Sequence, residues 1–600
     1  LQQVADQLTL YAGHVNDADY LQALIAMETE CKQCAISTQM LEEAANDLEE
    51  GTLRRKIQEL SLILSAYEAL AANAYVDPLD DLSKLTASLP DSSLIRGSVV
   101  FVDSFKGFTM QEMNVLTGIM RFADQITIAL CADSIQDDAE GYGRFSSVIH
   151  TIGQLLHRAH ENNVPVAGIE RLEHNFRSRT DALRFLEEGC FLPCPKVYYG
   201  EADSVSILPC PDVYTECSRI ASHIRRNIRE NKLRCRDVAI VVRDLGAYQG
   251  ILDVAMEQEG LSYYMDARQD ILSDPLVTLL LSALQASTGG WHTEDLLRMM
   301  KTGLLPFSVT TVSNMENYVF QWRINGSRWR QEWISNPAGL SAKEDEETTR
   351  QLSSLNRARQ RLIQPLERLR DCLKSYVQGD EFAQAVYRYL LDAQADKLLQ
   401  HRVKLLQQAE EHALANSMAR MWDILMDVLD QFATVLQHTS MPVSRYVELL
   451  RLVISVTDMG TIPQTLDAVQ IGSADRIRFA SPRAVYILGA NEGVFPAYPS
   501  SQGILGDKER LQLIELGISF TDMGDEQTAE ERFLAYAALS APSEQLVISY
   551  MESSVSGESL SPSILVETVR RILPGHKRVC ADDPLAFLES KQDAFSLLAQ

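Results

Sequence analysis

The sequence lacks the features that would place it in several broad classes of protein. No run of about 18 uncharged apolar residues predicts a membrane-spanning helix, and no basic stretch followed by an apolar core predicts a signal peptide. Basic residues are outnumbered, since 55 Lys and Arg stand against 82 Asp and Glu for a net charge of −27. A protein surface that is negative overall does not bind nucleic-acid phosphates over its whole extent. We therefore expect a cytoplasmic protein with no membrane partner, in which any DNA contact is a local basic channel or is supplied by another subunit.

Cysteine is sparse as well. The ten cysteines are scattered over 600 residues, which is typical of reduced thiols inside a cell and not of a disulfide framework. The close pairs Cys31 with Cys34 and Cys190 with Cys194 do not form a four-ligand set with the spacing of a metal site. We predict free thiols and no metal ligand.

A phosphate-binding loop of the form Gly-Xaa4-Gly-Lys-Ser/Thr is also missing, so the sequence contains no phosphate cradle of that type. The chain begins at Leu1 without a methionine and ends within a helical pattern at Gln600. We expect it to be an excised part of a longer polypeptide, so missing motifs can lie outside it.

The sequence does contain alternating helical and strand-like regions. The first 96 residues have helical apolar spacing, and the apolar runs Val99–Asp103 and Gln125–Cys131 then flank a helix at 110–122, which predicts a βαβ unit. Further buried strands are predicted at 205–209, 238–242, 261–265, 468–472, 484–488 and 546–549, and long amphipathic helices between 286 and 460. This order predicts an α/β fold whose parallel sheets are interrupted by helical insertions.

The predicted organisation has six parts. They are a helical subdomain at 1–96, the rest of a first α/β lobe at 97–195, a second lobe at 196–285, a helical insertion at 286–462, the return to the second lobe at 463–565, and a linker toward a further domain at 566–600.

Several motifs, in this order along the chain, resemble one family. The turn Glu492-Gly-Val-Phe-Pro496, which follows the strand at 484–488, resembles the second motor lobe of superfamily 1 helicases of the UvrD/RecB type. Three further segments make the chain similar to the AddB (RexB) family of bacterial helicase-nuclease subunits in particular: Val99–Thr109, Arg236–Asp244 with Ser273–Leu276, and Gly503–Arg510. The resemblance implies two RecA-like lobes with large all-helical insertions.

Two residues that an active motor of this kind needs are missing. The strand at 99–103 would end in Asp-Glu, with the Asp on magnesium and the Glu polarising water, but Asp103 is followed by Ser104. A serine hydroxyl is too weakly basic to take a proton from water. The motor pattern that supplies an arginine finger reads Glu530–Pro542 here and has no arginine at the finger position. We predict no catalytic residue and an inactivated motor.

The resemblance implies two vestigial positions of a nucleotide and magnesium site. Asp103 corresponds to the magnesium-binding residue, and Arg177, in Leu172–Ser178, to an arginine that meets the γ-phosphate in active relatives. The alternatives are an ordinary polar residue at the end of a strand for Asp103, and an ion pair with Glu173 or Asp181 for Arg177.

Two basic segments are candidate DNA contacts. One is the helix that carries Arg225, Arg226 and Arg229, for which the alternative is a solvated helix face. The other interleaves aromatic and basic side chains as a stacking platform would, and its alternative is a core-packing stripe of tryptophans. Its members are Trp322, Arg323, Arg328, Trp329, Arg330 and Trp333.

Three hypotheses for function follow. The first is the central, inactivated-helicase region of AddB, which channels and scans single-stranded DNA while an AddA-type subunit drives translocation along double-strand DNA ends for recombinational repair. The second is an ATP-driven helicase subunit, and the third a DNA-independent scaffold for the partner motor. The resemblance implies ATP, magnesium and an iron-sulfur cluster in the full-length protein, but we expect none of these cofactors and no enzymatic activity in these 600 residues alone.

Overall fold

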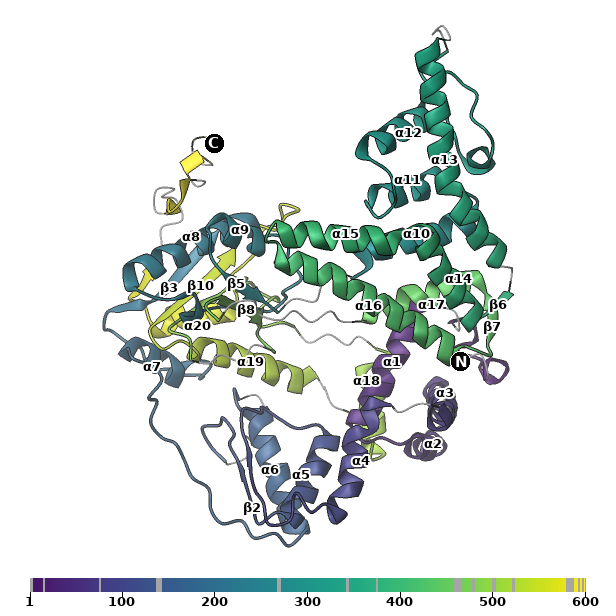
Figure 1. The fold of residues 1–600 in the computed structure, drawn as a ribbon. Coiled ribbons are helices and arrows are strands. Elements are labelled where there is room, and N and C mark those ends of the chain that lie inside the picture. The colour runs from purple at the N-terminus through teal and green to yellow at the C-terminus, as the bar shows by residue number, and fades with distance from the viewer. Residues whose placement is uncertain are drawn as a thin grey trace. The chain divides into compact units, whose positions relative to one another are not determined.

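A computed structural model describes residues 4–598 of the chain apart from 15–16, 75–76, 136–142, 267–270, 341–344, 374–375, 458–465, 477–480, 499–502, 519, 521–523, 579–586, 592–593 and 596–597. The chain divides into two compact units, residues 1–267 with 465–600, and residues 268–464 (Figure 1). Cys580 and part of the predicted linker at 566–600, including residues 579–586, lie outside the described residues. No helix in the described part of the chain combines the length and apolar character needed to span a bilayer.

The first unit begins with a helical layer. It consists of α1 (Ala18–Gln33), α2 (Thr38–Asp47), α3 (Thr52–Ala74) and α4 (Asp81–Ser88). Leu41, Ile57 and Leu60 form its core together with Leu513 of α18 (Asp507–Glu515), which comes from the far end of the chain. An ion pair of 2.6 Å between Lys56 Nζ and Glu509 Oε2 joins the same two regions. The family segment at 503–510 is therefore part of the packing of the N-terminal helices.

The predicted βαβ unit is confirmed. Strands β1 (Val99–Val102) and β2 (Gln125–Ile128) are parallel neighbours and flank α5 (Met110–Phe122), and α6 (Ser146–Glu161) follows. Helix α5 begins at 110 because Thr109 and Glu112 form a capping box. One face of the pair packs on α5, whereas Phe101 on the other face is 74% exposed.

A parallel sheet of seven strands forms the centre of the first unit. Its order is β11-β3-β10-β9-β4-β8-β5, and every neighbouring pair is parallel. The strands are β3 (Ala202–Cys210), β4 (Val238–Val242), β5 (Tyr263–Met265), β8 (Val469–Ser473), β9 (Ala484–Ile487), β10 (Gln545–Met551) and β11 (His576–Arg578). Six of them lie at the predicted apolar runs, and β11 was not predicted.

Helices cover both faces of this sheet, which confirms the predicted α/β fold. In β4, Val238, Ile240 and Val242 face the core shared with α8 (Val213–Asn231) and α9 (Leu252–Gln258). Ala239 and Val241 face the opposite core, because successive side chains of a strand alternate. That core is formed with α7 (Asp181–Gly189), α19 (Gly524–Ser540) and α20 (Ile564–Ile572), and Figure 1 shows α8 and α19 on opposite sides of the strands.

The second unit is almost entirely helical. Its helices are α10 (Pro275–Gly289), α11 (Thr293–Lys301), α12 (Val309–Gln321), α13 (Glu346–Cys372), α14 (Gly379–Asp392), α15 (Ala395–Gln408), α16 (His412–Val435) and α17 (Val443–Val456). A short antiparallel pair, β6 (Tyr376–Gln378) with β7 (Ser440–Pro442), and the 3-10 helices η6 (Ile271–Ser273) and η7 (Gly326–Arg330) complete it. These elements surround one apolar core, so the predicted helical insertion is present.

Candidate functional site

The carboxyl ends of the parallel strands form the first candidate site, because open α/β sheets bind ligands at that edge. The family turn at 492–496 follows β9 there. The buried Asn491 fixes it: Nδ2 donates to the carbonyls of Met551 (2.7 Å) and Ser561 (3.1 Å), and Oδ1 accepts from the Met551 N–H (2.9 Å). The turn is thus tied to the end of β10 by a side chain that is fully used within the protein.

A buried carboxylate lies behind the same turn. Glu216, in the first turn of α8, accepts from the Tyr248 hydroxyl (2.7 Å) and from the Gly489 N–H (3.0 Å). Burial raises the pKa of Glu216, against the opposing effect of these bonds and one from Ser549, and burial also raises the pKa of Tyr248. Gly489 has a φ of +66°, and a Cβ there would lie 2.5 Å from the Tyr248 Oη. Sequence reasoning missed Glu216, whose only signal was an acidic residue on the apolar face of a predicted helix.

One pair of opposite charges at this edge is bonded within the protein. Arg243 follows β4, and its Nε and Nη2 lie 2.9 Å and 2.6 Å from Oε1 of Glu531 in α19. The second oxygen of Glu531 accepts from the Ala497 N–H at 2.9 Å. Arg243 and Glu531 are therefore bonded to groups of the protein itself.

Asp103, the predicted vestigial magnesium position, lies directly after β1 and is exposed. Its Oδ1 accepts from the Ser104 N–H at 2.8 Å, and Ser104 adopts a left-handed φ of 67°. Searching the described residues for three or more His, Cys, Asp or Glu side chains placed to hold a metal ion finds no such group. A single carboxylate that is bonded to its neighbour does not provide the set of oxygen ligands that magnesium needs.

Arg177, the predicted phosphate position, lies at the end of α19. Its Nη1 donates to the Ser540 carbonyl at 3.3 Å, and its N–H donates to Asn175 Oδ1 at 2.9 Å. The carboxyl end of a helix favours a cation. Asp181, one alternative partner, pairs with Arg184 at 3.2 Å instead. Ser540 precedes Ala541, the residue that aligns with the arginine finger of the motor pattern, so Arg177 brings a guanidinium next to that position.

The predicted DNA contacts on α8 all have carboxylate partners. Arg225 Nη1 lies 3.3 Å from Glu259, whereas Arg226 Nε and Arg229 Nη1 each lie 2.7 Å from Glu589. These arginines hold neighbouring segments of the protein, and phosphate would have to compete with those carboxylates.

The predicted stacking platform is placed mainly in the core of the helical unit. Trp329 is fully buried and its Nε1 donates to Thr293 Oγ1 at 2.9 Å, and Trp333 is also buried. Trp322 is half-buried and donates to the Asn336 carbonyl at 3.2 Å, while Arg323 is exposed. The three tryptophans come from the end of α12, from η7 and from the loop after η7, and they pack in one core. The structure thus agrees with the core-packing alternative, although the tryptophans do not form a stripe on a single helix.

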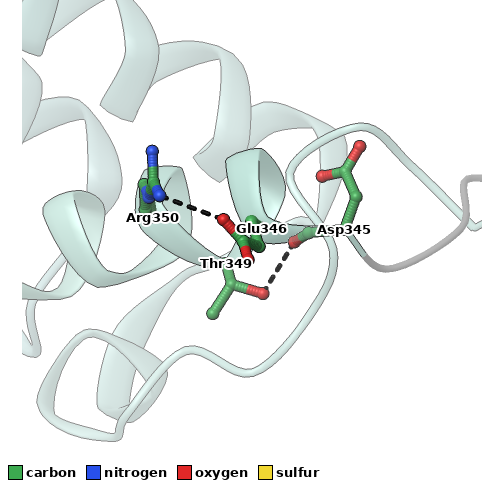
Figure 2. A pocket seen from close by; sticks show the side chains of 4 residues that line it. All are labelled: Asp345, Glu346, Thr349 and Arg350. Carbon is green, nitrogen blue, oxygen red and sulfur yellow. Dashed lines mark hydrogen bonds and ion pairs between the residues drawn. The ribbon is translucent and has the colours of Figure 1, made fainter.

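An open hollow of about 650 Å³ lies at the start of α13, lined by Asp345, Glu346, Thr349 and Arg350 (Figure 2). Thr349 Oγ1 donates to the Asp345 carbonyl at 2.9 Å, and Arg350 donates to Glu346 at 3.0 Å. The polar groups of the hollow are thus bonded to one another, as is usual at the start of a helix. These bonds do not indicate a ligand.

The fold and these motifs define an α/β protein with a parallel sheet, a helical unit inserted in the chain, and a family turn at the carboxyl edge. Residues 1–187 match the family model described as "ADDB, N-terminal". This match, at the N-terminal part of the chain, confirms the predicted resemblance to the AddB family.

Curated relatives named as the B subunit of an ATP-dependent helicase/deoxyribonuclease are similar along nearly the whole chain. Three examples follow. The protein from Thermoanaerobacter sp. (strain X514) is 27% identical over 580 residues, which is 96% of this chain and 50% of that protein. The one from Clostridium acetobutylicum is 26% identical over 601 residues, 99% of this chain and 52% of the relative. The one from Clostridium perfringens (strain 13 / Type A) is 28% identical over 590 residues, 96% and 51% respectively. The chain therefore spans about half the length of these relatives.

Proposed function

We propose that the protein is the B subunit of an ATP-dependent helicase-nuclease that processes double-strand DNA ends for recombinational repair. These 600 residues act in it as an inactivated motor that channels and scans single-stranded DNA. Similarity along nearly the whole chain to proteins that are named as the B subunit of such an enzyme supports the assignment. The partner is an AddA-type subunit that drives translocation, and ATP, magnesium and an iron-sulfur cluster belong to the full-length proteins.

One observation carries the inactive-motor part of the proposal. The residue after Asp103, where an active motor has its water-polarising glutamate, is Ser104, and its N–H is bonded to the Asp103 carboxylate. A serine in that place removes the general base, and the missing arginine finger removes the stabilisation of charge in the transition state. Two separate contributions to hydrolysis are therefore absent.

The test is DNA-stimulated ATP hydrolysis by the full-length natural protein without its partner. We expect turnover at least about 10³-fold below that of an active motor, because an arginine finger alone contributes roughly 10³ to 10⁵ in rate. The complex with an intact partner is the positive control, and the complex with a partner inactivated at its own ATP site should fall to the same low level. Turnover by the isolated protein at the rate of an active motor would instead establish the alternative of an ATP-driven helicase subunit.

A DNA-independent scaffold is the other candidate, favoured by the net charge of −27 and by the internally paired arginines of α8. Titration of the complex with labelled single-stranded DNA at several salt concentrations separates the two. Affinity that falls steeply as salt rises supports the channel, and no measurable binding at low salt supports the scaffold.

A further inference from the structure

The exposed face of α13 carries a line of arginines that the sequence analysis did not single out. Arg350, Arg357, Arg361 and Arg368 are all exposed and are separated by seven, four and seven residues. At 3.6 residues per turn, these spacings place the four side chains within about 20° of one line along the helix. The opposite face packs in the core of the unit through Leu355, Leu362, Leu366 and Leu369.

The two central arginines of this line, which we call the α13 arginine face, have no ion pair or hydrogen bond from their side chains to any described residue. These are Arg357 and Arg361. The outer two have exposed partners: Arg350 pairs with Glu346 at 3.0 Å and Arg368 with Asp392 at 2.9 Å. Exposed ion pairs contribute at most about 1 kcal/mol. Such pairs can exchange their carboxylate for another anion at little cost.

The surroundings keep this face both positive and fixed in place. Residues 350–368 contain five arginines and a single acidic residue, Glu367, whose Oε1 accepts from Arg330 Nε at 2.8 Å. The fifth arginine, Arg359, is buried and donates to the Trp329 carbonyl at 3.0 Å, which holds α13 against η7. In a chain of net charge −27, this segment is a local concentration of positive charge.

The remaining side chains on the line indicate what it would bind. Ser354 and Gln364 are exposed within about 40° of the line and are neutral hydrogen-bond donors. No large apolar side chain lies among them, whereas protein interfaces have apolar or aromatic residues at their centre. Guanidinium groups match phosphate oxygens in geometry and charge, and serine and glutamine are common phosphate contacts. At 1.5 Å per residue, Arg350 and Arg368 are about 27 Å apart along the helix, and Arg357 and Arg361 about 6 Å.

We propose that the α13 arginine face binds the phosphodiester backbone of DNA, with Arg357 and Arg361 as its principal contacts. The inference rests on the proposed function for DNA as the ligand, and does not depend on ATP hydrolysis. It moves the DNA contact of this chain from the predicted α8 arginines and tryptophans to a different helix.

The test compares the double variant R357Q/R361Q with the unaltered full-length complex, by fluorescence anisotropy with a labelled single strand and a labelled blunt duplex over a series of salt concentrations. Each lost phosphate contact lowers the slope of log K against log salt by about 0.9 for duplex and about 0.7 for single-stranded DNA. We expect the variant to bind at least about 10-fold more weakly at low salt, with a slope smaller by about 1.8 or 1.4, according to which form of DNA lies on the face.

Two controls keep the result specific. The variant R370Q/K397Q removes the same charge from exposed positions off the line, on α13 and α15, and should keep the unaltered slope. The variant R357K/R361K keeps the charge and should restore the slope while losing part of the affinity. Thermal unfolding of each variant within about 2 °C of the unaltered protein shows that the unit is folded, since surface substitutions change stability little.

An unchanged slope in R357Q/R361Q, with the unaltered complex binding DNA, overturns this inference and leaves the proposed function intact. Failure of the variant to sediment with its partner, together with an unchanged DNA slope, would identify the face as a protein contact and overturns it as well. If the unaltered complex binds no DNA at any salt concentration, the proposed function fails together with the inference.

Discussion

Helices α8 and α13 present arginines in the same way in the sequence but differently in the structure. Both are amphipathic, with one apolar face and arginines on the polar face. On α8, Arg226 and Arg229 are bonded to Glu589, 363 and 360 positions away along the chain. On α13, Arg357 and Arg361 have no such partner among the described residues. The number of arginines does not decide which helix can bind phosphate. What decides it is whether carboxylates from distant segments pair with those arginines.

The carboxylates on the two helices also differ in burial. Those that meet α8 are almost inaccessible, with side-chain exposures of 3% for Glu259 and 2% for Glu589, whereas Glu346, in the first turn of α13, is 89% exposed. A buried carboxylate is costly without its counter-charge, whereas an exposed one is solvated by water. The arginines of α8 are thus part of the packing, and those of α13 are available.

The largest expected effect concerns the residue beneath α13. Trp329→Ala should destabilise the helical unit by about 3–5 kcal/mol, because it leaves a cavity in the core and removes the bond to Thr293. Urea unfolding followed by circular dichroism measures it, with Arg323→Ala as the surface control within about 0.5 kcal/mol. If Trp329 served instead as a stacking platform, its loss would weaken DNA binding while leaving the unfolding free energy nearly unchanged.

The next effect concerns the buried carboxylate of α8. Glu216→Ala leaves the Tyr248 hydroxyl and the Gly489 N–H without their acceptor, which should cost about 2–4 kcal/mol of the unfolding free energy of the first unit. The matched control is Glu230→Ala, an exposed position near the end of the same helix. Equal stability of the two variants, measured by denaturant unfolding, would contradict a structural role for the Glu216 carboxylate of α8.

A pH effect should distinguish α8 further. His223 of α8 lies 3.0 Å from the Tyr486 hydroxyl, and burial, with Arg226 and Lys577 nearby, lowers its pKa from the ordinary 6.5 to about 4. Between these values the unfolded chain binds a proton that the folded protein does not, so stability is full above pH 6.5 and falls as the pH drops toward 4. We expect a loss of about 3 kcal/mol from this group. His223→Gln should flatten that part of the curve of unfolding free energy against pH, and an unchanged curve would show that His223 titrates normally.

The smallest effect would make α8 resemble α13. Glu589→Gln removes the charge that holds Arg226 and Arg229, and should lower stability by only about 1 kcal/mol because both arginines are partly exposed. The freed arginines should then add a weak, salt-sensitive DNA contact, read as a steeper slope of log K against log salt. An unchanged slope would mean that more than this one carboxylate keeps α8 from DNA.

Much of the fold was predictable because it depends on short apolar patterns. The run at 238–242 is apolar throughout, and a strand covered on both faces needs nothing else. Strand β11 was missed because His576-Lys-Arg578 has no such pattern, and it pairs only because β3 offers it an edge. The tryptophans at 322, 329 and 333 have helical spacing, yet they pack from separate elements around one core.

The candidate site was less predictable. The spacing of arginines on α13 is visible in the sequence, but α8 shows a similar spacing. Periodicity does not reveal which arginines will be paired with carboxylates from distant parts of the chain. Glu216 was missed for the same reason, since its partners Tyr248 and Gly489 are 32 and 273 positions away.

The sequence by itself determined the α/β class, the positions of most strands, the resemblance to the AddB family, and the absence of a glutamate after Asp103, because each of these depends on neighbouring residues or on a motif. Only the tertiary structure decided which arginines are neutralised, where Arg177 makes its contact, and that Trp329 lies in the core. The physical reason is that charge pairing and burial are set by groups that come together through folding, over separations at which the sequence carries no signal.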